Sequence, residues 1–280
     1  MKFAFAQTAV RCLSVGLAAS VMAGCSAGDV FKEINDYTNQ QKAELGARND
    51  AAAARQYWRS YAIADMTIRT EADREHDNRR HTFDTMRFAS MNKGQRVAEL
   101  MMGSGYFTRL LSAVVGPEGH VTAWQPAQFI VFGDEYASSA DAAEALANVD
   151  VIRSPITAPA LPTGLDLVFT AQNYHDMHLA AFPADTARSV NAAVFQSLKP
   201  GGYYVIIDHE AVPGSGLVGV QHMHRIDVAA VIEEVTAAGF VLEEQNDVLF
   251  RPNDTRTTDV FDPAIRGMTS QFMLRFRKPG

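Results

Sequence analysis

Histidine and carboxylate side chains gather late in the sequence, after two predicted strands. Five of the eight histidines and three acids share these loops: His175, His178, His209, His222, His224, Asp176, Asp208 and Glu210. Such a side chain can act as a general base. Neutral imidazoles with a carboxylate are also suitable ligands for a divalent metal ion. A third reading is that each histidine only caps a loop or lies on the surface. From their places beside strand ends, we expect His175 and Asp208 to be catalytic, and we assign no metal ligand.

A glycine-rich turn stands earlier, in residues 97–105 with the sequence VAELMMGSG. It follows a predicted strand and precedes a predicted helix. Glycine lets a backbone approach a ligand closely, and an acid at a strand end can accept hydrogen bonds from one. A purely structural turn between a strand and a helix has the same pattern. The glycine-rich turn therefore indicates a binding site only together with the other motifs of the sequence.

The elements that position these residues follow from the apolar pattern after Gly94. Strands are predicted at residues 96–101, 120–124, 149–153, 165–170 and 203–208. Helices are predicted at residues 107–115, 133–147, 184–198 and 227–238. Such alternation specifies a parallel sheet covered by helices on both faces. Residues 241–250 and 272–277 have no helix between them and suit an antiparallel pair at the sheet edge. The loops beyond the carboxyl ends of the parallel strands would form the binding crevice.

Three further motifs appear in a fixed order. They are LDLVF at residues 165–169, QNYH at 172–175 and LKPGG at 198–202, the last introducing a strand. With the glycine-rich turn, this set resembles the class I S-adenosylmethionine-dependent methyltransferases from about residue 93 to residue 278. More narrowly, the chain is similar to uncharacterised predicted methyltransferases that carry signal peptides, with counterparts at residues 224–227 and 251–267. The resemblance implies a Rossmann-like α/β fold: a seven-stranded, mostly parallel sheet with an antiparallel last strand.

The resemblance also implies a cofactor, S-adenosylmethionine. The positions that match the family's cofactor contacts are Glu99, Gly103, Gly105, Gln125 and Asn173. The charged segment of residues 69–80 precedes the first strand and in this family can lie over the cofactor pocket. Arg74, Asp77, Arg80 and His81 could therefore border the site, although a solvated helix face is the simpler interpretation.

Three positions depart from the family's pattern. Met101 stands where the first glycine is usual, Gln125 where an acid would hold the ribose hydroxyls, and Pro155 near an acid that often contacts the adenine amine. Gln125 can still hydrogen-bond hydroxyls as a neutral amide, whereas Pro155 has no side-chain acceptor. Met101 adds bulk beside the turn.

The N-terminus has the features of an export signal. Residues 1–24 contain Lys2 and Arg11 but no acid, and an apolar stretch follows Arg11 that is shorter than the roughly 18 residues of a membrane span. It ends VMAGC, which resembles the lipobox of bacterial lipoproteins. We expect a signal peptide at 1–24 and lipidation of Cys25, with an ordinary cleavage site as the alternative. Residues 25–65 would form a tether and helix, and residues 66–280 the methyltransferase-like domain.

Composition limits the partners. The 280 residues carry a net charge of -7, and removing the leader takes away two positive charges and one of the two cysteines. This acidity argues against nucleic-acid binding. A chain left with Cys25 alone has no intramolecular disulfide and no buried thiol nucleophile. We expect a periplasmic protein that meets the membrane only through Cys25 and binds a small molecule.

Two functions fit these observations. The first is methyl transfer from S-adenosylmethionine to a small acceptor. The second is an exported binding protein that keeps the fold and uses the crevice for another ligand or a metal, since fold does not fix function. The donor is made in the cytoplasm, which counts against the first.

Overall fold

The computed structural model describes residues 27–64, 67–131 and 133–280. The expected signal peptide and Cys25 lie outside them. The first described element is the helix α2 (Ala27–Ala64), and the chain divides into two compact units within it, at residues 1–54 and 55–280. Of the described helices, none has the length and apolar character to cross a membrane. The last part of α2 belongs to the larger unit, because Trp58 packs on that unit's core and donates a hydrogen bond to the Val114 carbonyl oxygen at 2.6 Å.

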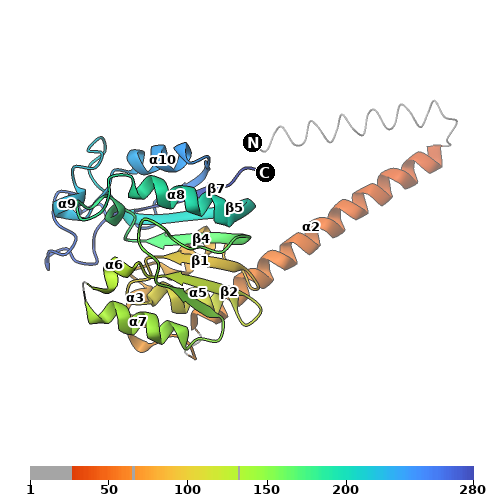
Figure 1. Ribbon diagram of the computed structural model, residues 1–280. Coiled ribbons are helices and arrows are strands. Elements are labelled where there is room, and N and C mark those ends of the chain that lie inside the picture. Colours follow the sequence, from red (N-terminus) through yellow and green to blue (C-terminus); the bar gives the residue numbers. More distant parts are fainter. Residues whose placement is uncertain (1–26, 65–66, 132) are drawn as a thin grey trace. The chain divides into compact units, whose positions relative to one another are not determined.

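A seven-stranded sheet forms the centre of the larger unit (Figure 1). Its strands are β1 (Arg96–Leu100), β2 (His120–Trp124), β3 (Val149–Ile152), β4 (Leu165–Ala171), β5 (Leu198–His209), β6 (Val241–Asn246) and β7 (Gln271–Arg277). Their order is β3-β2-β1-β4-β5-β7-β6, and only β7 runs antiparallel to its neighbours. The predicted fold is confirmed, including the antiparallel pair at the edge.

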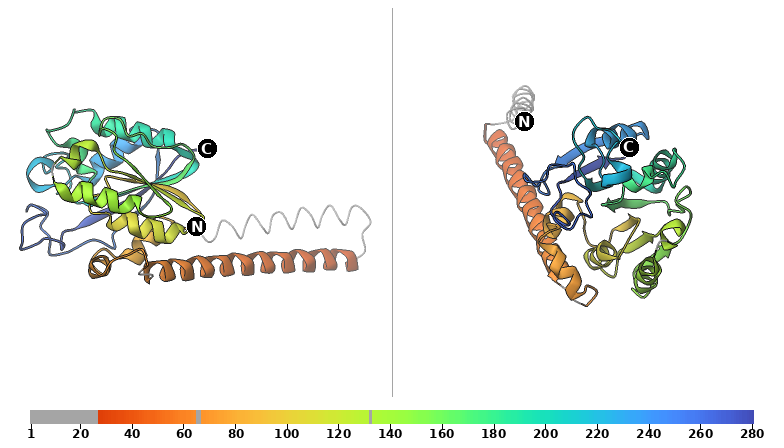
Figure 2. Two further views of the ribbon diagram at one scale, coloured as in Figure 1. Left: turned by 60° about the horizontal axis from the view of Figure 1, so that its bottom comes forward. Right: turned by 90° about the vertical axis from the view of Figure 1, so that its left-hand side faces the viewer.

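Helices cover both faces of the sheet, and Figure 2 shows the sheet between these two layers. Adjacent residues of a strand point to opposite faces, so Val97 joins one apolar cluster and Ala98 the other. The first cluster includes residues of α4 (Thr82–Phe88), α5 (Tyr106–Val115) and α7 (Asp134–Glu144). The second includes residues of α6 (Ala127–Ile130), α8 (Thr186–Ser197) and α10 (Val228–Ala237). Strands buried on both faces explain the apolar runs in the sequence.

The charged segment before the sheet forms two short helices, α3 (Glu71–Asp77) and α4. Thr70 caps α3 with a capping box, in which its hydroxyl accepts from the Asp73 N–H and the Asp73 carboxylate accepts from the Thr70 N–H. His81 breaks the helical path with a φ of 44°. The remaining short elements, η1 (His175–His178) and α9 (Val220–Met223), lie in loops that follow β4 and β5.

Candidate functional site

A cavity of about 200 Å³ lies at the carboxyl ends of β1, β2 and β4. The chain crosses to opposite sides of β1 through β2 and β4, so this is the topological switch point where open α/β sheets bind ligands. Residues 101–104 of the glycine-rich turn line it, with Gln125 after β2 and residues 171–173 at the end of β4. The cavity thus contains most of the residues expected to contact a cofactor.

The backbone beside the cavity is unusual at two strand ends. Met101 after β1 has a φ of 53°, and Gln172 after β4 has a φ of 65°. Both are in the left-handed region, which costs a non-glycine residue free energy and is common at functional sites. Gly103 and Gly105 share this region, with φ of 56° and 77°. Met101 therefore adopts a backbone conformation that favours glycine, and its buried side chain belongs to the core cluster that also includes residues of α8.

The amide oxygen of Gln125 binds the backbone of the glycine-rich turn. Its Oε1 accepts a hydrogen bond from the Gly103 N–H at 3.0 Å, which fixes the orientation of the amide. Its Nε2 is buried and has no hydrogen-bond partner. An unpaired buried donor is costly, and Gln125 lines the cavity. A ligand with an acceptor group would remove this cost.

Asn173 connects the ends of β4 and β1 through hydrogen bonds. Its Nδ2 donates to the Met101 carbonyl oxygen at 2.7 Å, and its Oδ1 accepts from the Thr170 hydroxyl. Asn173 lines the cavity as expected. Its amide shapes the site by holding the strand ends together.

Glu99 is a buried acid in the cavity wall. Burial raises its pKa to about 8, which outweighs the hydrogen bond donated by the Thr108 hydroxyl at 2.5 Å and the nearby charges of Arg109 and Arg80. In the free protein at neutral pH, Glu99 is therefore mostly protonated. A cationic ligand group nearby would favour its ionised form.

Arg80 brings a cation to the same cavity. Its guanidinium lies 4.5 Å from the centre of the Tyr106 ring and 5.1 Å from that of Phe107. Burial lowers its pKa, its buried Nε lacks a partner, and no acid of the described residues forms an ion pair with it. Stacking on aromatic rings stabilises a guanidinium and leaves its outer edge free for an anion.

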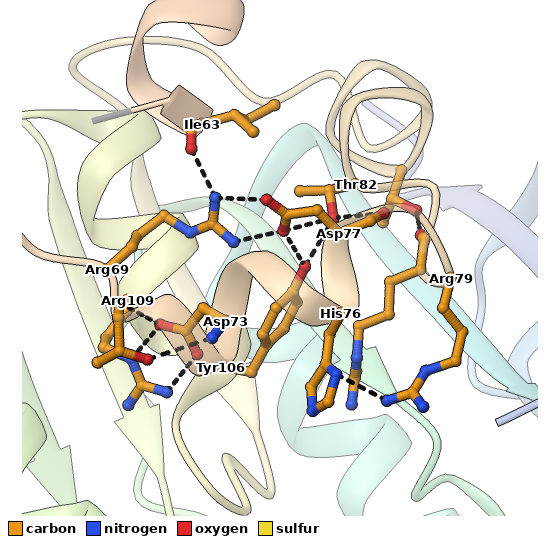
Figure 3. A network of polar contacts seen from close by, with 12 residues as sticks. Ile63, Arg69, Asp73, His76, Asp77, Arg79, Thr82, Tyr106 and Arg109 are labelled. Atoms are coloured by element: carbon orange, nitrogen blue, oxygen red, sulfur yellow. Dashed lines mark hydrogen bonds and ion pairs between the residues drawn. The ribbon is translucent and has the colours of Figure 1, made fainter. Parts of the chain in front are cut away.

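A network of ion pairs holds the segment that carries Arg80 against α5 (Figure 3). Asp77 accepts hydrogen bonds from Arg69 at 2.5 Å and from the Tyr106 hydroxyl at 2.8 Å. Arg109 of α5 pairs with both carboxylate oxygens of Asp73, at 2.6 and 2.7 Å. Of the four residues considered as bordering the site, Arg80 lines the cavity, Asp77 belongs to this network, and Arg74 and His81 do not line it.

His175 and Asp208 are buried and do not line the cavity. His175 Nδ1 contacts Asp208 Oδ1 at 2.8 Å, and its Nε2 lies 3.2 Å from Asp176 Oδ1. Burial alone would lower the His175 pKa, but the Asp208 charge and the hydrogen bonds to Asp176 and Asp208 raise it to about 10. A protonated imidazole with both nitrogens engaged cannot accept a proton. The catalytic role that we expected for these two residues stays a prediction, and the geometry favours a structural one.

Three other histidines of these loops have polar partners of their own, and the ring centres of His209 and His224 lie 6.2 and 5.7 Å from that of His175. His209 contacts the Thr269 hydroxyl, His178 pairs with Glu234, and His224 lies near Asp259, while His222 is exposed. Burial and the His175 charge lower the pKa of His209, so it is neutral. Within the part of the chain that the structure describes, no group of three or more His, Cys, Asp or Glu residues could hold a metal ion.

Asp176 and Phe261 also line the cavity. From the sequence we expected Asp176 in the loops of the crevice but did not choose it as a site residue. Phe261 comes from a distant loop, and only the fold brings it near. Pro155 is exposed and Trp124 is fully buried, and neither lines the cavity.

Comparison with known proteins gives a fold but no close relative. No protein-family model matches the sequence, and no curated protein matches it. A SAM-dependent methyltransferase from Aquifex aeolicus is similar, with 18% identity and a TM-score of 0.50 over 70% of this chain and 88% of that chain.

Two further structures have the same TM-score of 0.50. N-methyltransferase NodS from Bradyrhizobium japonicum WM9 is 13% identical over 72% of this chain and 97% of its own. The [4+2]-cyclase SpnF is 17% identical over 72% of this chain and 80% of its own. The same architecture thus occurs in a protein described by another chemistry. The chain has the Rossmann-like fold of the class I S-adenosylmethionine-dependent methyltransferases.

Proposed function

We propose that this protein is an S-adenosylmethionine-dependent methyltransferase of a small acceptor. The observation that carries the proposal is the pair of buried, unpartnered donors, Gln125 Nε2 and Arg80 Nε, in residues that line one cavity beside the glycine-rich turn. Unsatisfied donors at a switch point indicate a ligand rather than a packing role.

The residues present fit the chemical groups of this cofactor. Ribose hydroxyls can accept from Gln125 Nε2, and the carboxylate of the methionine part suits the unpaired guanidinium of Arg80. The backbone at Gly103 and Ser104, which has no side-chain bulk at Gly103, borders the same space. Glu99 can ionise beside a cationic group of the ligand, as its raised pKa leaves a proton to lose.

When bound, S-adenosylmethionine supplies a methyl group on a positively charged sulfur. The protein's part is to bind and orient. Asn173 fixes the ends of β1 and β4, and the Asp73–Arg109 pair fixes the segment that carries Arg80. Positioning of this kind accounts for much of an enzyme's rate enhancement.

Calorimetric titration of the full chain with S-adenosylmethionine and S-adenosylhomocysteine tests the proposal. We expect both to bind, and we expect Gln125→Leu and Arg80→Leu each to weaken binding about tenfold or more, because each removes a hydrogen-bond donor to the ligand. His222→Leu, at an exposed position outside the cavity, is the matched control. Absence of binding by the folded wild-type protein at millimolar ligand would refute methyl transfer.

The second candidate is an exported binding protein. The neutral amide of Gln125, in place of an acid, favours a ligand that offers an acceptor there and does not require ribose. Transfer of a labelled methyl group to any component of an extract separates the two functions, because a binding protein gives none.

We also propose that the protein is exported and lipid-anchored at Cys25, on the basis of the VMAGC sequence after a short apolar stretch. Mass spectrometry of the mature N-terminus tests this directly. Acyl chains on Cys25 are expected, and an unmodified N-terminus at another residue excludes the anchor.

A further inference from the structure

Asp176 is a carboxylate whose side chain is only partly used by the protein. It lines the cavity, and its Oδ1 lies 3.2 Å from Nε2 of the protonated His175. Among the described residues, no donor forms a hydrogen bond or ion pair with its Oδ2. His175 is itself fixed by Asp208, so Asp176 is held in place with one oxygen available.

The cavity therefore contains two opposite charges that do not pair with each other. Arg80 and Asp176 both line it, yet the described residues include no ion pair between them. Arg80 forms no ion pair with an acid of the described residues, and the one positive charge of His175 faces two carboxylates, Asp208 and Asp176. Because that single cation does not balance both acids, the cavity can take two ligand groups of opposite sign, an anion at Arg80 and a cation at the free oxygen of Asp176.

Three aromatic side chains, Phe129, Tyr136 and Phe261, line the same cavity as Asp176, and we call them the aromatic rim. Phe129 and Tyr136 make an edge-to-face contact with ring centres 6.2 Å apart, and both line the cavity. Burial and then the Asp176 charge raise the Tyr136 pKa, so Tyr136 lies near this carboxylate. Phe261 completes the rim from the C-terminal loop and is half exposed although it lines a cavity. Such rings suit an apolar ligand body.

We propose that Asp176 binds the ammonium group of an amine substrate whose apolar body packs on Phe129, Tyr136 and Phe261. The inference names the acceptor class and so rests on the proposed methyl transfer. The binding site itself requires only the cavity, the free carboxylate oxygen and the aromatic rim.

Three probes of similar size test it: 2-phenylethylamine, 2-phenylethanol and phenylacetate, which are cationic, neutral and anionic at pH 7. Each is titrated calorimetrically into the full chain, with and without saturating S-adenosylhomocysteine. We expect the wild type to bind the amine about tenfold or more tightly than phenylacetate, as a charged hydrogen bond allows. Asp176→Asn should reduce this ratio to about threefold or less, because the negative charge is gone.

Asp185→Asn is the matched control, since Asp185 is an exposed carboxylate outside the cavity, and it should leave the ratio unchanged. Circular dichroism confirms that each variant is folded. A wild type that does not prefer the amine, or an Asp176→Asn variant that keeps the preference, overturns the proposal. If the amine preference depends on Asp176 but S-adenosylhomocysteine does not bind, methyl transfer fails and the amine site stands.

Discussion

The strongest single prediction concerns His175, which lies between two carboxylates in the interior. Its side chain is 3% exposed and contacts Asp208 on one side and Asp176 on the other. Replacement by glutamine removes the positive charge and leaves the fully buried Asp208 without its charged partner. Asp208 would keep only the backbone N–H groups of residues 175 and 209.

Two routes give a similar magnitude for this loss. The rise of the His175 pKa from 6.5 to about 10 corresponds to on the order of 5 kcal/mol of stabilisation of the folded state. Removing one partner of a buried ion pair costs about 3–5 kcal/mol in other proteins. We therefore expect His175→Gln to lower the free energy of unfolding by about 3–5 kcal/mol at pH 6.

The stabilisation by His175 should depend on pH in a defined direction. A pKa raised by folding means that the stabilisation is complete below the unfolded value of 6.5 and is lost as pH rises through 10. The difference between wild type and variant should then shrink steadily from pH 6.5 to pH 10. His209 contributes little to this difference, because burial, the larger cause of its lowered pKa, is the same in both proteins. The raised pKa of Glu99 is common to both proteins and cancels in the difference.

Urea denaturation of the full chain at several pH values measures this difference through tryptophan fluorescence, since both Trp58 and Trp124 pack in the larger unit. His222→Gln, at an exposed position, is the control and should change the free energy of unfolding by less than about 0.5 kcal/mol. Parallel curves for wild type and His175→Gln from pH 6.5 to 10 would refute the assignment of an imidazolium at this position.

Three further predictions concern the cavity and the segments beside it. Gly105→Ala should lower the free energy of unfolding by about 1–2 kcal/mol, because the φ of 77° is unfavourable for alanine and the new Cβ would lie 2.9 Å from Arg109 Nη1. Gly94→Ala is the control, since Gly94 has a φ of 79° and no neighbour within 4 Å, so this variant measures the cost of the backbone conformation alone. Asp73→Asn should lower the free energy of unfolding by about 2 kcal/mol at pH 7, because it breaks the two-point contact with Arg109. The loss should be smaller near pH 3, because the pKa of Asp73 is lowered in the folded protein and its stabilising contribution disappears as the pH falls through that pKa. Binding of S-adenosylmethionine at pH 7 should release up to one proton from Glu99. Calorimetry in buffers of different ionisation enthalpy measures this release. Neither the Glu99→Gln variant at pH 7 nor the wild type at pH 9.5 should release the proton.

The sequence was sufficient for the sheet because its strands are buried on both faces. Apolar runs such as residues 96–100 and 165–171 carry that burial in their composition, and the predicted edges differ from the observed ones by a few residues. The exception is β5, which begins at Leu198 and includes the Lys-Pro-Gly-Gly segment that we interpreted as a turn. The left-handed backbone of His81, which separates α3 from α4, has no signature in the sequence.

The cavity was less predictable than the fold for a geometric reason. Of the five candidate cofactor contacts, Glu99, Gly103, Gln125 and Asn173 line the cavity, because they lie in or near the ends of neighbouring strands, whereas Gly105 does not line it. Their role as cofactor contacts stays a prediction. The sequence could not tell which atoms of these residues are free, since that depends on partners across the sheet. His175 is an example: it follows β4 as expected, but it contacts Asp208 on the neighbouring strand β5 and does not line the cavity.

Gln125 shows how a departure from a family's pattern can define a ligand. A carboxylate at this position would be acceptor-only, and it could receive both the Gly103 N–H and the hydroxyls of a ribose. The amide divides these tasks, because its oxygen accepts from the Gly103 N–H and its buried nitrogen is a donor that has no partner. Any group bound there must accept a hydrogen bond, which a ribose oxygen, a carbonyl or a carboxylate can do and an ammonium cannot. The cation must then bind elsewhere, and in the described cavity wall the acids are Glu99 and Asp176. The proposed amine site at Asp176 and an acceptor group at Gln125 both agree with this distribution of donors and acceptors.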